Sequence, residues 1–240
     1  MPDTDDKRPY SAPRTARERA RAEITREILD AGRRYLATDG AAGLSLRAIA
    51  RDLGMASSAV YRYVASRDEL LTRLIIDAYD SLGAAAEERE TKVRRSDLFG
   101  RLAAVCTAVR DWALANPNEY ALIYGSPVPG YVAPEDTIGP ASRVSSLLIQ
   151  ILKEARLPSE DARAGSSWRS ALGPVREVFP PEIPDSAIQA SLMVWAGLFG
   201  VVSFELFGQF RNVVSEEPAA RAAFFAECIR RWAGQLGLAG

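Results

Sequence analysis

Residues 57–63 carry the side chains best suited to recognition chemistry in this sequence. A helix over 57–64 would turn Val60 and Val64 inward. Its outer face would present Ser57, Ser58, Tyr61 and Arg62. Hydroxyl, aromatic and guanidinium groups of this kind bond phosphates and base edges or touch a thymine methyl group. The segment therefore favours contact with nucleic acid.

The composition argues against most catalytic chemistry. The 240 residues contain no His, which excludes Ser-His-Asp hydrolysis, Cys-His nucleophiles and His-ligated zinc. Cys106 and Cys228 lie too far apart in sequence for a Cys-x-x-Cys motif, so we interpret both as reduced thiols. The carboxylate pairs at 87–88 and 216–217 are explained as solvated helix ends. We expect no cofactor, no metal and no enzymatic activity.

The charge is unevenly distributed along the chain. There are 30 Lys plus Arg and 31 Asp plus Glu in all, but residues 1–67 hold 13 basic and 9 acidic side chains. A basic N-terminal segment followed by a mildly acidic body indicates a polyanionic partner for the first part only. A solvated helix face can be equally basic, so the charge alone leaves both interpretations open.

Supporting helices must hold the 57–64 segment in place. Apolar residues at steps of four, three and four predict a helix over 15–38. A helix over 46–52 would begin after the N-cap Ser45 and end at Gly54. Two such short helices need the longer one for stability. The pattern is that of a helix-turn-helix, whose second helix enters the DNA major groove, although a hairpin that only packs in a bundle is the alternative.

The rest of the chain also has helical periodicity, and the expected fold is all-α. Ser66 and Glu69 form a capping box that opens a helix over 67–90. Later helices are expected at 97–115, 117–125, 135–157, 186–209 and 217–237. The stretch 158–185 is left open between a short helix near 166–172 and a partly disordered flap.

No targeting or spanning segment is expected. The first twenty residues are polar and charged, which does not fit a secretory signal. The longest apolar run, Leu192–Phe204, is too short to cross a bilayer. The expected location is the cytoplasm.

Residues 25–71 resemble the N-terminal domain of the tetracycline-repressor (TetR) family of bacterial transcription regulators. The motifs that carry the resemblance are A-I-A followed by L-G, then V-Y-R-Y and S-R-D-E-L. Three positions depart from the family pattern: Tyr63 stands where His is frequent, Ala65 replaces a common Pro, and Ala56 replaces the usual capping Ser or Thr. Because of Ala56, Ser57 would have to cap the helix.

The resemblance implies a set of DNA contacts. Thr25 and Arg26 are weaker candidates for phosphate contact. Arg62 can fork onto guanine, and Arg67 would reach a phosphate from the start of the next helix. The expected DNA-binding residues are Ser45, Arg47, Ser57, Ser58, Tyr61, Arg62, Tyr63 and Arg67.

The C-terminal part is expected to form a dimer. Residues 195–208 resemble the Trp-His-Gly type of C-terminal domain, with Phe199 in the position of the His. Apolar residues repeat at steps of four and three along the last two helices, which is the spacing of a packing seam. An intramolecular core is the alternative to the pairing of these helices that the family implies. The expected interface residues are Ile188, Leu192, Trp195, Phe199, Val202, Leu206, Phe225, Ile229 and Trp232.

A ligand pocket is expected between the DNA-binding part and this seam. Aromatic residues at helical spacing are often plain core, but an apolar cavity would suit a hydrophobic or aromatic small molecule. Its expected walls are Phe99, Trp112, Tyr120, Tyr124, Tyr131, Leu148 and Trp168. The resemblance thus implies a homodimeric repressor that a small apolar ligand releases from operator DNA. The expected organisation is a flexible tail over 1–14, a DNA-binding domain over 15–67 and an effector-binding and dimerisation domain over 68–240.

Overall fold

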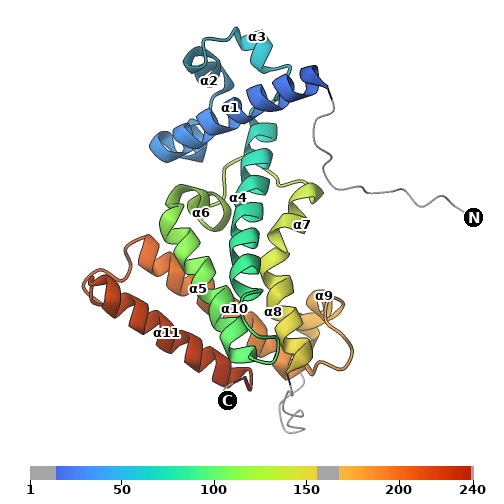
Figure 1. Ribbon diagram of the computed structural model, residues 1–240, viewed down its shortest axis with the longest axis vertical. Coiled ribbons are helices and arrows are strands. Elements are labelled where there is room, and N and C mark those ends of the chain that lie inside the picture. The colour runs from blue at the N-terminus through green and yellow to red at the C-terminus, as the bar shows by residue number, and fades with distance from the viewer. Residues whose placement is uncertain (1–14, 156–167, 239–240) are drawn as a thin grey trace, which may run out of the picture. The chain divides into compact units, whose positions relative to one another are not determined.

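The computed structural model describes residues 15–155 and 168–238, and these residues form helices and connections without a strand (Figure 1). The all-α prediction is confirmed. The described residues fall into two compact units. The first runs to Leu74 and includes Pro127–Val132, and the second contains Ile75–Ser126 and the chain from Ala133 onward. The expected tail over 1–14 lies outside the described residues.

The first unit is built on a long helix that supports two short ones. It contains α1 (Ala16–Asp39), the 3₁₀ turn η1 (Ala41–Gly43), α2 (Leu46–Asp52), α3 (Ser57–Val60) and the start of α4 (Arg67–Glu90). Gly40 ends α1 with a φ of 66°, which a glycine adopts without strain. At Gly32 of α1, an added Cβ would lie 3.3 Å from Leu74 Cδ1 of α4. The small residue allows this close approach of the two helices.

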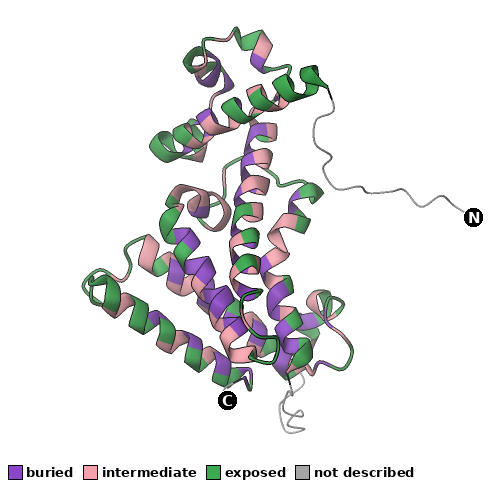
Figure 2. Cartoon of the chain, in the orientation of Figure 1, coloured by how far each residue is buried: buried purple, intermediate pink, exposed green. Residues whose placement is uncertain are grey.

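The second unit is organised around α5 (Leu98–Ala115), which packs against α8, α10 and α11. Its other elements are α6 (Pro117–Tyr124), η2 (Glu135–Thr137), α7 (Ile138–Ala141), α8 (Arg143–Glu154), η3 (Arg169–Leu172), α9 (Gly173–Arg176), α10 (Asp185–Leu206) and α11 (Pro218–Gln235). Figure 2 shows that α5 is largely buried. The unit is therefore a helical body with α5 at its centre.

The predicted helices of the second unit differ from the structure at one place, and one open stretch is resolved in part. The single helix expected over 135–157 is divided into η2, α7 and α8, since Pro140 has no N–H for the helical ladder and Ser142 has a ψ of −9°. In the open stretch 158–185, η3 and α9 occupy Arg169–Arg176, and residues 158–167 lie outside the described part of the chain. The other predicted helices of this unit agree with the structure to within a few residues.

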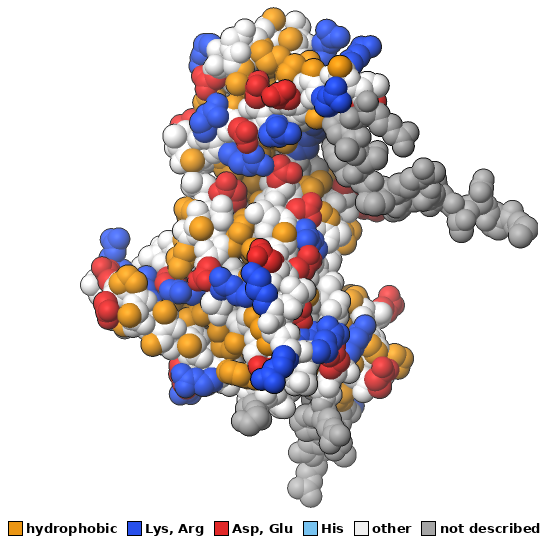
Figure 3. All heavy atoms as spheres, viewed as in Figure 1, with side chains coloured by type: hydrophobic (Ala, Val, Ile, Leu, Met, Phe, Trp, Pro, Cys, Tyr) orange, Lys and Arg blue, Asp and Glu red, His pale blue; other side chains and the backbone are white. Residues whose placement is uncertain are grey.

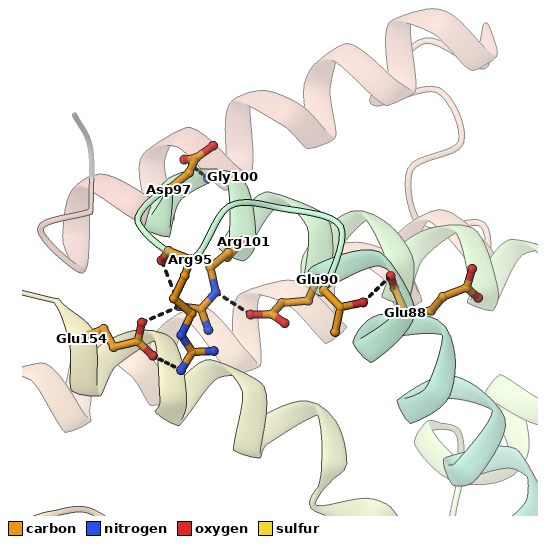
Figure 4. A network of polar contacts seen from close by, with 8 residues as sticks. Glu88, Glu90, Arg95, Asp97, Gly100, Arg101 and Glu154 are labelled. Atoms are coloured by element: carbon orange, nitrogen blue, oxygen red, sulfur yellow. Dashed lines mark hydrogen bonds and ion pairs between the residues drawn. The ribbon is translucent and has the colours of Figure 1, made fainter.

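Buried arginines tie the helices of the second unit together. Arg110 of α5 donates two hydrogen bonds to the Glu205 carboxylate of α10, at 2.7 and 2.6 Å, and hydrogen bonding to Glu205 raises the pKa of Arg110. Arg101 of α5 lies between Glu90 of α4 and Glu154 of α8, with Nη1 3.0 Å from Glu154 Oε2 (Figure 4). Because a buried cation needs a paired anion, each of these pairs fixes which helices lie side by side.

A third arginine, Arg143 at the start of α8, crosses α4. It donates to both carboxylate oxygens of Glu87, at 2.9 and 2.6 Å, and to Asp80. These hydrogen bonds raise the pKa of Arg143 and lower the pKa of Glu87. An added Cβ at Gly83 would lie 2.6 Å from Arg143 Nε, so only a glycine lets the guanidinium lie against the helix.

Helix α10 is long and apolar along most of its length. Among the described residues it is the one helix long and apolar enough to cross a membrane, with 22 residues and a mean hydropathy of 1.7 over its most apolar 18 residues. The prediction counted only the uninterrupted run from Leu192 to Phe204. The core helices of soluble proteins can be equally long and apolar, and α10 buries Ile188, Leu198 and Val202 inside its own chain. Only 39% of its most apolar window is buried, which leaves a second apolar face uncovered.

Candidate nucleic-acid interface and effector region

The turn between α2 and α3 forms as the sequence predicts. Ser45 Oγ accepts a hydrogen bond from the Ala48 N–H at 3.4 Å and caps α2. Gly54 follows α2 with a φ of 63°, and the Met55 N–H donates to the Ala50 carbonyl at 2.8 Å. A backbone of this shape reverses the chain within a few residues and sets α3 across from α2.

Helix α3 is shorter than predicted. It ends at Val60, and the backbone continues as tighter turns in which Arg62 N–H donates to Ala59 at 3.2 Å and Tyr63 N–H donates to Val60 at 2.9 Å. Ala56 occupies the N-cap without a side-chain hydrogen bond, so the expectation that Ser57 caps the helix is wrong. Ser57 is already the first helical residue and lies one position too late.

The structure brings the predicted contact residues to the surface of the first unit. Ser57, Ser58, Tyr61 and Arg62 are exposed, and we call these four the reading face. Arg47 at the start of α2 is also exposed, whereas Ser45, Tyr63 and Arg67 are half-buried. Arg side chains lie at the surface of the α1–α3 region (Figure 3). Exposed arginines of α1 include Arg17, Arg21 and Arg26. The surface thus combines hydroxyl, aromatic and cationic groups.

Two of the half-buried residues also make contacts inside the first unit. Arg67 Nη2 donates to the Ala41 carbonyl of η1 at 2.8 Å, so Arg67 joins the start of α4 to the end of α1. The Tyr63 ring lies under the guanidinium of Arg21, with 5.2 Å from Cζ to the ring centroid. Arg21 could not be identified from the sequence, because its partners are about forty residues away and no local spacing marks them.

The capping box of α4 differs in detail from the predicted one. The Glu69 carboxylate accepts a hydrogen bond from the Ala65 N–H, and the Ser66 hydroxyl accepts one from the Glu69 N–H.

An aromatic cluster joins α4, α6 and α10 in the second unit. Tyr124 stacks on Phe199 with ring centroids 4.1 Å apart, and Tyr79 meets Tyr124 edge-on at 5.9 Å. Tyr120 is fully buried and its hydroxyl lies 2.9 Å from Ser203 Oγ. Burial raises the pKa of all three tyrosines, so their hydroxyls stay protonated at neutral pH. Trp195 lies edge-on to Phe199 at 5.8 Å and remains 42% exposed, which places it where the cluster meets solvent.

The other predicted pocket residues do not gather around one cavity. Trp112 is buried and donates from Nε1 to Ser81 Oγ at 2.9 Å. Phe99 and Trp168 are half-buried against the core. Tyr131 belongs to the first unit, where its hydroxyl lies 2.9 Å from Thr72 Oγ1. Only Leu148 lines the small apolar cavity described next. These aromatic residues lie apart because their spacing places them on one face of a helix but does not determine which neighbouring element that face packs against.

The second unit contains a small apolar cavity beside α5 and α8. Its volume is about 10 Å³, which is room for about one water molecule and far below the ~300–1,000 Å³ usual for ligand pockets. The lining residues are Leu102, Leu148, Ile151, Leu152, Ser191, Val194 and Leu236. Across the described parts of the chain, no group of three or more Cys, Asp or Glu side chains is arranged to hold a metal ion.

The predicted dimer seam lies mostly inside the chain's own core. Five of its members are at most 8% exposed within the chain itself: Ile188, Phe199, Val202, Phe225 and Ile229. Leu192, Leu206 and Trp232 are half-buried. Helix α10 is apolar on both sides. Apolar residues at steps of four and three therefore occur on its inner face and also on the opposite side. The opposite side carries the exposed Gln189, Met193, Ala196 and Phe204 and the half-buried Gly200, which we call the outer face of α10.

Comparison with known proteins agrees with this architecture. A family model described as bacterial regulatory proteins, tetR family, matches residues 28–74, and one described as tetracyclin repressor-like, C-terminal domain, matches residues 102–232. An N-terminal helix-turn-helix followed by a helical body of this type defines a DNA-binding transcriptional regulator. The chain belongs to the TetR family.

Individual relatives support the same assignment. The HTH-type transcriptional regulators Rv1816 of Mycobacterium tuberculosis (strain ATCC 25618 / H37Rv) and Mb1846 of Mycobacterium bovis are each 44% identical over 208 residues, covering 84% of this chain and 88% of the relative. The crystal structure of the regulatory protein SCO4313 has a TM-score of 0.75 and 34% identity, and the match covers 92% of this chain and all of that one. The likeness therefore extends over both units.

Proposed function

We propose that this TetR-family regulator is a homodimeric repressor that a small apolar ligand releases from its operator. The observation that carries the proposal is the exposed outer face of α10, where Met193 is 58% and Phe204 is 51% exposed. A helix that is apolar all round is normally buried on all sides. A second copy of the chain would cover this face by a two-fold pairing, which presents two reading faces to two half-sites.

Aromatic side chains extend the apolar surface beyond α10. Phe204 lies edge-on to Phe210 at 5.6 Å, and Phe210 lies edge-on to Phe224 of α11 at 5.7 Å. Phe224 is 40% exposed. This row of rings connects the outer face of α10 with α11 and adds area that a partner would bury, as a stable interface requires.

The proposed division of labour places reading in residues 15–67 and dimerisation and effector binding in residues 68–240. The first compact unit runs to Leu74, within α4. The protein would act in the cytoplasm, where its operator DNA lies, and the proposal assigns it no enzymatic activity. Its proposed base contacts come from the reading face, with Ser45, Arg47, Tyr63 and Arg67 at its border.

We predict different effects for two arginines of the first unit. The exposed Arg62→Ala should weaken operator binding by about 1–3 kcal/mol and relax base preference, because a guanidinium in the groove recognises a base edge. Arg67→Ala should weaken binding to all sequences alike and reduce the salt dependence. Since Arg67 also bonds the Ala41 carbonyl, its loss should lower the free energy of unfolding by about 0.5–1.5 kcal/mol.

Fluorescence anisotropy measures this difference. Each variant is titrated with a labelled operator, with single-base variants of it, and at several salt concentrations, while thermal unfolding reports stability. The operator is the tightest binder selected from a random duplex library. Equal loss of base preference in both variants would contradict the separate roles.

The proposed effector region is the aromatic cluster around Tyr124. It combines stacked rings with the hydroxyl groups of Tyr79 and Tyr120, and it meets solvent at Trp195. The cluster contains residues of α4 and α6. Along the chain, each of these two helices is connected directly to residues of the first unit. An apolar or aromatic ligand that separates these rings would favour a state of the protein with weaker operator affinity.

Tyr124→Ala should therefore impair release of DNA by an effector. A panel of hydrophobic aromatic compounds is screened by tryptophan fluorescence with and without operator. Linkage requires that DNA weaken the binding of a true effector, by about 5–150-fold for typical couplings. Trp168→Ala removes an aromatic side chain outside the cluster and serves as the control. If Tyr124→Ala leaves effector release unchanged, the effector binds outside the aromatic cluster.

A further inference from the structure

The last residues of the recognition segment are not part of a helix. After Val60 the chain continues in turns, in which the Arg62 and Tyr63 N–H groups donate to residues three positions earlier, although the Tyr61 N–H still donates to Ser57. Turns of this kind have weaker hydrogen-bond geometry than α-helical ladders. A contact from another element is therefore needed to fix the direction of the Arg62 and Tyr63 side chains.

Arg21 of α1 makes this contact in two ways. Its Nη2 donates to the backbone carbonyl of Arg62 at 3.0 Å. Its guanidinium carbon lies over the Tyr63 ring, 5.2 Å from the centroid. The planar guanidinium can bond an oxygen with its edge and meet an aromatic ring with its face at the same time. One side chain thus holds both the backbone and the ring at the end of the segment.

We propose that Arg21 is a positioning residue that determines the base preference of the protein by fixing Arg62 and Tyr63. The inference depends on the reading face proposed above. Arg21 lies on α1, forty-one residues before Arg62, and acts through that residue's backbone. Replacing Arg21 changes no residue of the reading face, but it removes the contact that holds the turn and orients Arg62.

A positioning role for Arg21 predicts different effects on DNA binding from those of a phosphate contact. A phosphate contact contributes equally to all sequences, and its loss lowers the slope of affinity against salt. A positioning residue affects the ratio between correct and incorrect sequences. Arg21→Lys keeps the positive charge but replaces the planar fork with a compact ammonium group. It should therefore keep the salt slope and lose base preference.

The test uses the full chain and the tightest duplex selected from a random library, together with the same duplex carrying single exchanged base pairs. Arg17→Ala is the matched control, because Arg17 is exposed one helical turn earlier and carries the same charge. We expect Arg21→Ala and Arg21→Lys to reduce the affinity ratio between the selected and exchanged duplexes by about tenfold, within the range of one lost base contact. Arg17→Ala should leave the ratio unchanged. In an Arg62→Ala background, Arg21→Ala should change the ratio less than twofold.

The outcomes distinguish this inference from the proposed function. If Arg62→Ala lowers the ratio but both Arg21 variants retain it, Arg21 is not a positioning residue while the reading face stands. If Arg21→Ala lowers affinity for all duplexes alike and reduces the salt slope, Arg21 is a phosphate contact. If Arg62→Ala itself leaves the ratio unchanged, the reading face is wrong, and the role of Arg21 fails with it. Circular dichroism confirms folding, and Arg21→Lys tests the proposal even if Arg21→Ala unfolds.

Discussion

Gly200→Glu is expected to convert the proposed dimer into a monomer and to weaken operator binding by about 10²–10⁴-fold, the usual gain from linking two binding modules. Gly200 lies on the outer face of α10, and an added Cβ there has no heavy atom of the protomer within 4 Å. The protomer therefore has room for the glutamate side chain, and replacing a helical glycine favours the helix. At a two-fold interface, however, two carboxylates would be buried against apolar side chains without partners.

Two further variants show whether the effect is specific. Gly139→Glu places the same side chain at an exposed helical glycine that also has no atom within 4 Å of its Cβ, and it should leave the oligomeric state unchanged. Gly197→Ala is the opposite case, since its Cβ would lie 3.0 Å from Trp232 Nε1 and disturb the packing of α10 on α11 within one protomer. Sedimentation equilibrium at micromolar concentration and anisotropy titrations provide the measurements. If Gly200→Glu stays a dimer with full operator affinity, the outer face is not the interface.

Removing the buried carboxylate of Glu205 should lower the free energy of unfolding by about 3–5 kcal/mol. Glu205 and Arg110 have side chains only 7% and 10% exposed, and two hydrogen bonds join them. The Arg110 guanidinium also lies over the Phe225 ring of α11, 5.5 Å from the centroid. In Glu205→Ala the cation would remain buried among apolar side chains without its anion, and α5, α10 and α11 would lose their shared contact.

Replacing both partners separates the charge effect from the loss of contacts. Arg110→Met with Glu205→Leu removes both charges and keeps apolar volume, so it should be far less destabilising than Glu205→Ala alone. Arg89→Ala breaks another interhelical pair, with Asp111 of α5, whose side chains are 42% and 46% exposed, and it should cost less than about 1 kcal/mol. Urea unfolding measures all three variants. Equal destabilisation by Glu205→Ala and Arg89→Ala would show that burial does not govern these pairs.

Local features of the first unit were predictable because neighbouring residues determine them. Ser45 caps α2, Gly54 ends it with a positive φ, and Ser66 accepts the hydrogen bond that opens α4, as the residue types and spacing predict. Each depends on a side chain and a backbone group within a few residues of one another. The early end of α3 was not predictable, since residues 61–63 have no helix breaker and their conformation is supported from α1.

Tertiary structure alone decided the roles of residues whose partners are distant in sequence. The periodicity of α10 fits two faces equally well, and only packing against α5 and α11 determined that Ile188 and Val202 point inward while Met193 and Phe204 remain exposed. The sequence determined the family, the helical class and the residues at the turn of the helix-turn-helix. It did not determine the partner of Arg21 or the two sides of α10, because apolar spacing specifies that a helix has a buried face without specifying what covers it.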